Sequence, residues 1–247
     1  MVGIVGTAIS LLLAFRTGQA YDRWWEARNI WGAIVNESRT FIRQLQLFLP
    51  SEQQEEVKVF AERQIIWCFA LADALRKKPF ETNVSEYIKA NNITDANIPN
   101  AILSLHQKQI KILAQKGLLT EFREVQLDST VSKFCDAMGK CERIKNTIFP
   151  LSYGKLIHLC IYIFAFLLPF SLEPEHTFIK AILTASIPLL FLIIERTAII
   201  MQDPFEGEPM DTPMTTISRT IEINLLQMVG KKAPMISENS KKYYYVL

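Results

Sequence analysis

The chain has 247 residues, of which 49% are hydrophobic and 21% are charged, and its formal net charge at pH 7 is +2. This near-neutral charge, with basic and acidic residues interleaved, argues against a nucleic-acid partner. The length allows one or two domains with a sizeable core. The hydrophobic content lies between that of a soluble enzyme and that of a transporter, because long charge-free runs alternate with highly charged ones.

The first fifteen residues are almost wholly apolar, and residues 1–31 contain no proline, so one long helix is predicted there. From Phe15 onward this helix becomes densely polar and carries two adjacent indoles, Trp24 and Trp25. Tryptophan favours the headgroup level of a bilayer, so the change is typical of a helix that leaves a membrane. A signal peptide is disfavoured, because neither a basic region nor a small-residue cleavage site flanks the run. Since about 20 residues are needed to cross a bilayer, the chain is expected to begin inside a transmembrane helix.

The next part of the chain predicts further helices. The opening helical pattern continues to Pro50. Ser51 and Gln54 then have the spacing of a capping box, which predicts a second helix that runs to about Lys78. Residues 81–100 are rich in Asn and Thr and are expected to form mostly loop, with a single helical turn near the middle.

Two more helices are predicted before the next apolar runs. The first begins at about Ala101 and ends at Gly117 as a C-cap. The second begins at Leu118 or Thr120 and continues with heptad-like apolar spacing to about Thr147. Nothing in this part of the sequence indicates a strand of any length.

Two apolar runs, residues 156–172 and 181–194, are joined by the acidic connection Glu173-Pro174-Glu175-His176. Two such runs with so short a link predict a hairpin of two membrane helices, and a soluble core explains the pair poorly. The connection has no basic residue, whereas basic residues flank the opposite ends of the apolar segments. By the positive-inside tendency the connection is external and the charged regions are cytoplasmic. Three crossings with a cytoplasmic C-terminus place Met1 on the outer side.

The chain closes with an irregular linker at residues 203–209 and a last helix. Thr212 is expected to cap this helix and Pro213 to open it, and Gly230 marks its end. The tail, residues 231–247, is polar and carries a tyrosine cluster. It is expected to be partly disordered or to cover a neighbouring surface.

Residues suited to catalysis are few, and no catalytic residue, metal site or cofactor is predicted. The three histidines, His106, His158 and His176, lie far apart, and no metalloprotease, nucleophile-elbow or P-loop spacing is found. His158 lies inside an apolar run near its cytoplasmic end. A hydrogen bond to a neighbouring helix is favoured over a role as a functional ionisable group. Four cysteines without a C-x-x-C pair are expected to be reduced thiols, some of them buried: Cys68, Cys135, Cys141 and Cys160.

The segment from Phe15 to Gly32 reads F-R-x-x-x-x-Y-D-R-W-W-E-A-R-x-x-W-G and resembles the signature of the bacterial branch of the bestrophin family of pentameric ion channels. Asp203-Pro204-Phe205, followed by Arg219-Thr220-Ile221-Glu222, resembles the family's N-P-F-G and R-x-I-E elements. Asn146-Thr147-Ile148-Phe149-Pro150 resembles the point at which the family enters its third membrane helix. Together these elements cover nearly the whole chain in the right order.

The resemblance implies an all-α fold, with integral membrane helices, a large helical cytosolic domain and assembly as a homopentamer in the lipid bilayer of the cell membrane. It also implies passive conduction of chloride or other small monovalent ions, since the family is described as chloride channels while bacterial members can prefer cations. Two other classes stay open. A membrane-bound enzyme would show convergent titratable residues in a cytosolic cleft, and a non-conducting scaffold or sensor would show no conduction.

The resemblance also implies which residues line the pore. In the family the helix that opens this sequence lines a narrow neck, and counting back from the signature places the neck positions at Thr7, Leu11 and Phe15. A ring of such side chains carries no charge and gates by width and dewetting. Thr7 departs from the apolar pattern and would make its ring more hydrated. The alternative is that Leu11 and Phe15 pack against neighbouring helices. Phe149 resembles a second constriction at the cytosolic exit.

The charged and aromatic signature is expected to serve helix and subunit packing, with ion contact as the alternative. Its members are Arg16, Tyr21, Asp22, Arg23, Trp24, Trp25, Glu26 and Arg28. If these charges are buried, they must be paired.

The chain departs from the family in two places. The family has a further membrane helix before the one that opens this sequence, and an in-frame apolar run upstream of Met1 would supply it. Eukaryotic members bind calcium through an acidic cluster after N-P-F-G. Here Glu206, Glu208 and Asp211 are spread among other residues, so no calcium site is predicted and a solvated linker is expected.

These expectations divide the chain into five parts. They are residues 1–31, the pore-lining helix and its cytosolic continuation; 32–154, a cytosolic helical region; 155–200, a membrane hairpin; 201–230, a cytosolic linker and helix; and 231–247, the tail.

Overall fold

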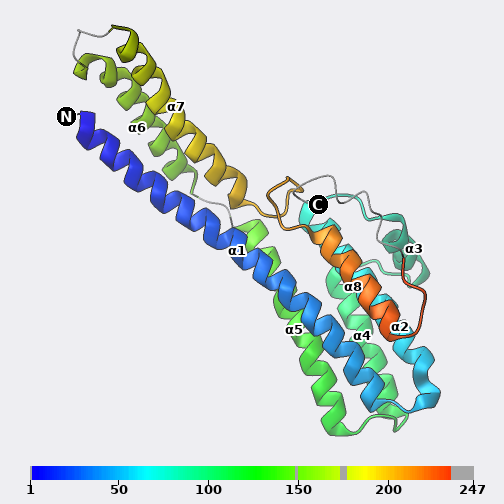
Figure 1. The fold of residues 1–247 in the computed structure, drawn as a ribbon. Helices are drawn as coiled ribbons and strands as arrows, with labels where there is room; N and C mark the ends of the chain where they lie inside the picture. The colour runs from blue at the N-terminus through cyan, green and yellow to red at the C-terminus, as the bar shows by residue number, and fades with distance from the viewer. Residues whose placement is uncertain (1, 148–149, 173–176, 235–247) are drawn as a thin grey trace. The chain divides into compact units, whose positions relative to one another are not determined.

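The structure is a computed structural model that describes residues 2–147, 150–172 and 177–234, and within these ranges it contains helices and no strand (Figure 1). The all-α fold class is thereby confirmed. The chain forms two compact units. The first unit consists of residues 1–26 and 146–204, and the second of residues 27–145 and 205–247. Helix α1, Val2–Phe48, contributes its beginning to the first unit and its remainder to the second.

The first unit combines the start of α1 with α6, Leu151–Ser171, and α7, Thr177–Gln202, which pack side by side. These three helices are long and apolar enough to cross a membrane. The predicted hairpin is confirmed as a pair of helices, and both extend beyond the apolar runs that predicted them. Helix formation continues into the polar flanks because nothing there interrupts the backbone hydrogen bonds. The connection at residues 173–176 lies outside the described residues.

The core of the first unit lies between α1 and α6. Ile9 and Leu13 of α1 are buried against one face of α6, which contributes the buried residues Ile157, Ile161, Phe164 and Leu168. The helices approach closely at Gly6, where an added Cβ would lie 3.1 Å from the ring of Phe164. A glycine at this position lets the Phe164 ring pack directly on the α1 backbone.

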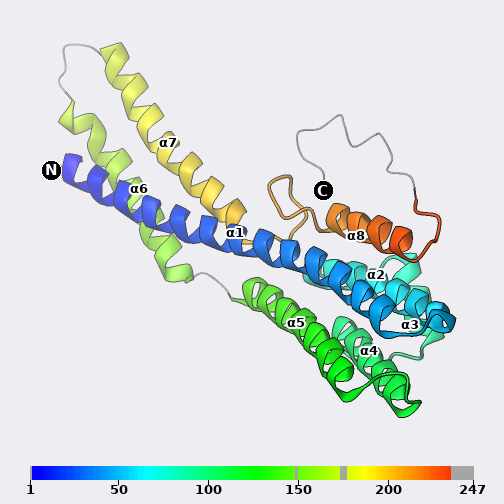
Figure 2. The same ribbon diagram turned by 60° about the horizontal axis from the view of Figure 1, so that its bottom comes forward.

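The second unit is a bundle around α2, Gln54–Arg76 (Figure 2). Helix α2 packs against α3, Thr82–Ala90, α4, Ile98–Gln115, and α8, Met214–Met228. Helix α5, Glu121–Asn146, follows α4 after a short turn and closes the bundle together with α1. Large aromatic side chains fill the centre: Trp31, Phe41, Phe60, Trp67, Phe69, Phe134 and Phe205.

The predicted capping box at Ser51 is wrong. Ser51–Gln53 form a short 3₁₀ turn, α2 begins at Gln54, and no side chain caps either element. The Gln53 N–H donates to the Pro50 carbonyl at 2.9 Å, so the chain winds tightly before α2 starts. Ser51 is therefore part of a preceding turn and does not occupy the N-cap position of the helix. Helix α2 ends at Arg76, close to the expected residue, where Lys77 turns left-handed at φ 55°.

The loop predicted at residues 81–100 is mostly helical. Helix α3 occupies nine residues of it, and α4 already begins at Ile98. Val84 is buried, and Tyr87 and Ile88 pack against the core. These three apolar residues fall at helical spacing, and their burial outweighs the weak helix propensity of the neighbouring Asn and Thr residues. Asn97 caps α4 by accepting a hydrogen bond from the Asn100 N–H at 3.1 Å.

The predicted stop at Gly117 is confirmed. Its φ is +73°, and its N–H donates to the Ala114 carbonyl at 2.9 Å, which is the left-handed ending that glycine allows. The predicted cap at Thr212 is wrong. Met214 donates its N–H to the backbone carbonyl of Thr212 at 2.8 Å, and the Thr212 hydroxyl has no partner among the described residues. The tail prediction falls mainly on residues 235–247, which lie outside the described residues.

Candidate functional site

One face of α1 in the first unit is apolar and exposed. Leu11 is 73% exposed and Phe15 is 58% exposed, and Ile4 and Thr7 lie on the same face. The opposite face is buried, with Ile9 at 0% and Leu13 at 2% exposure. Residues at i, i+4 and i+8 share one side of a helix, so Thr7, Leu11 and Phe15 form a row. We call Ile4, Thr7, Leu11 and Phe15 the exposed α1 face.

Thr7 is less polar in this row than its side chain suggests. Its hydroxyl donates to the Gly3 carbonyl at 3.0 Å, one turn earlier in the same helix. The hydroxyl proton is thus used within the helix, while the oxygen can still accept a hydrogen bond. The Thr7 hydroxyl oxygen can therefore accept a hydrogen bond from a water molecule, but its proton is not available to that water.

Phe15 is steadied on one side by α6. Its ring centroid lies 6.2 Å from that of Tyr153 with a tilted geometry, and the Tyr153 hydroxyl donates to the Leu12 carbonyl at 3.2 Å. A cavity of about 420 Å³ lies beside the two rings and is also lined by Gln19. The position of Phe15 on α1 is therefore fixed by neighbours that leave most of its ring uncovered. Phe149, the expected second constriction, lies outside the described residues.

A buried ion pair joins α1 to α7 directly after Phe15. Arg16 Nη1 lies 2.6 Å from Oε1 of Glu195, and Glu195 is only 1% exposed. The second carboxylate oxygen lies 2.7 Å from Nε2 of His158 on α6. The expected hydrogen bond from His158 to a neighbouring helix is confirmed. A buried carboxylate needs such partners, because an unpaired charge is very unfavourable in an apolar surrounding.

Two further contacts fix the rotation of α1. A Cβ at Gly154 of α6 would lie 3.3 Å from the guanidinium of Arg16, so glycine leaves room for that group. One turn after Ala20, Arg23 donates through Nε to the Gln202 carbonyl at 2.9 Å. Because both arginines reach toward α7, α1 cannot rotate without breaking these bonds. The exposed α1 face is thereby held in one direction, with the Phe15 ring beside Tyr153 of α6 at its edge.

The remaining signature residues lie nearer the surface of the single chain. Tyr21, Trp24 and Trp25 form a chain of ring contacts with centroids 5.9 and 6.2 Å apart. Asp22 and Arg28 are exposed, and Arg23, Trp24 and Glu26 are half-buried. Of the eight signature residues, Arg16 is the only one that is fully buried.

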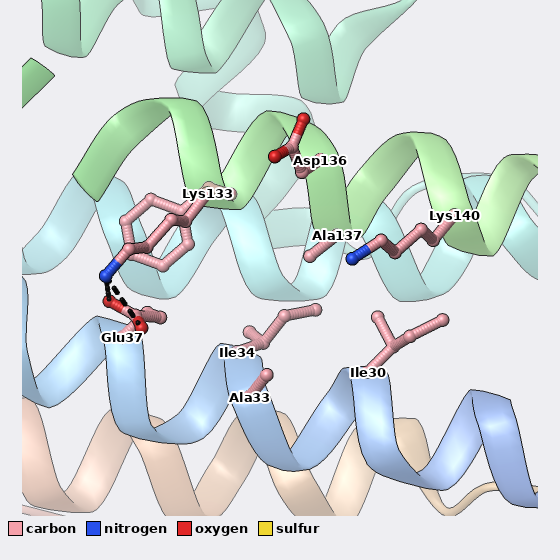
Figure 3. A pocket seen from close by; sticks show the side chains of 9 residues that line it. Ile30, Ala33, Ile34, Glu37, Lys133, Asp136, Ala137 and Lys140 are labelled. Carbon is pink, nitrogen blue, oxygen red and sulfur yellow. Dashed lines mark hydrogen bonds and ion pairs between the residues drawn. The ribbon is translucent and has the colours of Figure 1, made fainter. Parts of the chain in front are cut away.

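The second unit carries a groove between α1 and α5 that the sequence did not indicate (Figure 3). Its volume is about 190 Å³. Ile30 and Ile34 point into it from α1, and Ala137 faces them from α5. At its rim Lys133 Nζ lies 3.2 Å from a carboxylate oxygen of Glu37. The floor is apolar and Lys133 is paired with Glu37, so the groove offers little chemistry.

The acidic residues after Phe205 hold the linker together. One Asp211 oxygen accepts hydrogen bonds from the backbone N–H groups of Gly207, at 2.7 Å, and Glu208, at 3.0 Å. Glu206 pairs with Lys145 at 2.5 Å. Among the described residues no group of three or more His, Cys, Asp or Glu side chains could hold a metal ion. The expectation of a freely solvated linker is therefore wrong for Asp211, which is buried.

Glu195 is the residue of this site that the sequence interpretation missed. The sequence marked it only as the end of an apolar run. An available signal was that a carboxylate within a membrane helix normally has a cationic partner on another helix. The first arginine after the opening apolar run, Arg16, was the matching candidate.

Comparison with known proteins gives a consistent result. The model of a family described as bacterial and fungal bestrophin proteins matches residues 1–227. The voltage-dependent anion channel-forming protein YneE of Escherichia coli (strain K12) is 31% identical over 229 residues, which cover 91% of this chain and 75% of that protein. The voltage-dependent anion channel-forming protein mll4386 of Mesorhizobium japonicum is 27% identical over 98% of this chain and 79% of its own length. The crystal structure of a bacterial bestrophin homologue from Klebsiella pneumoniae matches with a TM-score of 0.87 at 28% identity, over 94% of this chain and 87% of that one.

Proposed function

The chain belongs to the bacterial and fungal bestrophin family, and from this premise we propose that it forms a homopentameric channel that conducts chloride or other small monovalent ions passively across the cell membrane. Relatives that share most of their length with this chain are named as voltage-dependent anion channel-forming proteins. Three helices long and apolar enough to span a bilayer support the membrane location.

The observation that carries the proposal is the exposed α1 face. In a bilayer, an apolar side chain can face lipid without loss, because the lipid tails are as apolar as the side chain. An exposed apolar row on a membrane helix therefore does not by itself indicate a pore. Here the row lies opposite a well-packed face, and the ion pair of Arg16 with Glu195 and the hydrogen bond of Arg23 to the Gln202 carbonyl hold α1 in that rotation. In a ring of copies related by an axis along α1, Thr7, Leu11 and Phe15 would form three stacked constrictions.

Such constrictions would work by width and hydration. Leu11 and Phe15 offer no charge and no hydrogen bond to replace the water around an ion, so the passage is conductive only when it is wide enough to stay wet. The Thr7 ring can accept hydrogen bonds from water and is the easiest of the three to hydrate. The neck would therefore set the barrier to permeation at Leu11 and Phe15.

We place the connection between α6 and α7 outside the cell and the second unit and the C-terminus in the cytoplasm. The distribution of basic residues supports this orientation, since Arg16, Arg23, Lys155 and Arg196 all lie on the side away from that connection. Residues 1–31 then carry the pore helix and its continuation, residues 155–200 the hairpin, and the rest the cytosolic part.

A pair of leucines tests the neck assignment. Leu11→Ala removes a side chain from the exposed face, whereas Leu13→Ala makes the same change on the buried face two residues later. We expect Leu11→Ala, alone or with Phe15→Ala, to leave the pentamer intact and to raise ion flux into liposomes, because a wider and less apolar ring stays hydrated. Leu13→Ala should instead reduce stability by about 2–5 kcal/mol, because it opens a cavity.

Assembly is measured on the same samples by light scattering in detergent. A pentamer of the Leu11→Ala variant with wild-type flux would contradict the neck assignment. A wild-type pentamer without flux would favour a non-conducting scaffold or sensor. A monomeric wild-type protein would remove the basis for a shared pore.

A further inference from the structure

Asp22 continues the exposed α1 face. It lies eleven positions after Leu11, and eleven residues are about three turns of an α-helix, so the two side chains leave α1 in nearly the same direction. Asp22 is exposed, as are Leu11 and Phe15. Among the residues of α1 that share this direction, it is the first with a charge.

Two arginines near Asp22 in the sequence, Arg16 and Arg23, are directed elsewhere. Arg16 is buried against Glu195, and Arg23 donates to the Gln202 carbonyl and interacts electrostatically with Asp203 and Glu26. Adjacent residues such as Asp22 and Arg23 do not face each other on a helix. Within the part of the chain that the structure describes, the Asp22 carboxylate forms no hydrogen bond or ion pair.

The space between Phe15 and Asp22 is open. Gly18 lies between them on the same side of α1, and a Cβ added there would meet nothing within 4 Å. The helix rise places Asp22 about 10 Å beyond Phe15 along the axis. An ion that has passed Phe15 would therefore regain water beside Gly18 before it reaches the level of Asp22.

We propose that Asp22 is a specificity-determining residue of the pore, and that a ring of its carboxylates, one from each copy, attracts monovalent cations and repels anions at the inner mouth of the neck. The inference rests on the proposed function, because it needs the copies to share an axis along the exposed α1 face. Rings of acidic side chains act in this way in cation-conducting pores. The uncharged neck cannot distinguish the sign of an ion, so the nearest fixed charge decides it.

The ring opposes the anion conduction for which the relatives are named. Each copy adds one negative charge at the same level, and low-dielectric pore walls strengthen its field on a passing ion. Anion permeation through this chain would then be limited by Asp22, and its removal would raise the permeability to chloride relative to potassium.

The test compares the wild type with variants at Asp22 in planar bilayers that separate two potassium chloride concentrations. Asp22→Asn removes the charge and keeps the shape, and Asp22→Glu keeps the charge. Asp95→Asn is the matched control, because Asp95 is exposed, lies between α3 and α4, and has no ion pair in the described part of the chain. The measured quantity is the ratio of chloride to potassium permeability, obtained from the reversal potential of protein verified as pentameric.

We expect Asp22→Asn to raise this ratio about threefold, because a potential of roughly one kT at the ring changes the ratio by about that factor. Asp95→Asn and Asp22→Glu should leave the ratio unchanged. The difference between Asp22→Asn and wild type should shrink at about 1 M salt, where the Debye length falls to about 3 Å. A purely structural role would not produce this dependence on salt.

Two results would overturn the inference while leaving the pore intact. In the first, Asp22→Asn has the wild-type ratio although Leu11→Ala raises the flux. In the second, Asp22→Asn loses the pentamer and Asp22→Glu restores it, which would identify Asp22 as a contact between copies. Failure of the proposed function itself looks different, since then the wild type conducts no ions or Leu11→Ala leaves the flux unchanged.

Discussion

His106 is a titratable side chain enclosed by aromatic rings in the second unit. It is completely buried, stacks on Phe60 with a centroid distance of 5.5 Å and meets the edge of Phe41 at 5.1 Å. Among the described residues neither ring nitrogen has a hydrogen-bond partner. Burial, with a smaller contribution from the charge of Arg63, holds the pKa of His106 well below its ordinary value of 6.5. The folded protein therefore keeps this imidazole neutral.

We predict that His106 makes the protein less stable in mild acid. Above pH 6.5 the imidazole is neutral in both states and contributes no pH dependence. Below it the unfolded chain binds a proton that the folded chain excludes, so the free energy of unfolding falls by up to about 1.4 kcal/mol per pH unit. Thermal unfolding in detergent at about pH 7.5 and about pH 5.5 measures the effect.

His106→Phe is the matched variant, because it keeps a ring in the stack and cannot bind a proton. Its melting temperature should change less between the two pH values than that of the wild type. Equal changes in both proteins would show that other groups cause the acid sensitivity.

The ion pair of Arg16 and Glu195 could be predicted from the sequence only in part. The sequence shows that Arg16 ends one apolar run and Glu195 ends another. Charges that are buried at such positions are expected to be paired. The pairing itself depends on α1 and α7 coming together, and on the room that Gly154 leaves for the guanidinium. These are properties of three helices, which no local pattern encodes.

At the level of elements, Gly6 and Gly3 occupy the same helix in different surroundings. A Cβ at Gly6 would lie 3.1 Å from Phe164, whereas a Cβ at Gly3 would meet nothing within 4 Å. Both substitutions to alanine gain helix propensity of about 1 kcal/mol. Only the one at Gly6 forces Phe164 to move.

We predict that Gly6→Ala separates α1 from α6 and lowers stability by about 1–3 kcal/mol, since overpacking a tight contact has this effect. Gly3→Ala should be neutral or stabilising. Thermal unfolding of the two variants in detergent provides the comparison. A Gly6→Ala protein at least as stable as Gly3→Ala would show that α6 yields without strain.

Helix boundaries were predicted well where a backbone requirement decided them and poorly where packing did. Gly117 ended its helix as expected, because a left-handed residue there needs glycine. The capping box predicted at Ser51 and the N-cap predicted at Thr212 both failed, because a 3₁₀ turn precedes the first helix and a buried linker precedes the second. Helix α3 was underestimated, because the burial of its Val84 in the core is a tertiary effect.

At the scale of the whole molecule, the family resemblance predicted the all-α class, and two apolar runs joined by a short link predicted the membrane hairpin. The signature after Phe15 led to the family, and the comparisons confirm it. The sequence shows a change from apolar to polar at Phe15, but it could not reveal that the boundary between the two units divides α1 after residue 26, because the helical pattern continues across that point without a proline. The exposed α1 face likewise became visible only when the opposite face was seen to be packed.

Orientation in the membrane can be tested with the protein's own thiols. Cys135 of α5 is exposed, whereas Cys68 and Cys141 are buried and Cys160 is half-buried in α6. Burial raises the pKa of the Cys68 thiol to about 12, so it is unreactive at neutral pH. With Cys160→Ala as the background, Cys135 is the thiol that a maleimide should modify.

We predict that a membrane-impermeant maleimide labels Cys135 only after the cells are permeabilised, because the proposed orientation places the second unit in the cytoplasm. A second variant, Cys135→Ala with Glu175→Cys, moves the reactive thiol to the connection between the hairpin helices, and it should be labelled in intact cells. The reverse pattern would mean that the orientation is inverted and that the basic residues do not control it. Labelling of both variants in intact cells would place both segments outside, which three crossings with a cytoplasmic second unit forbid.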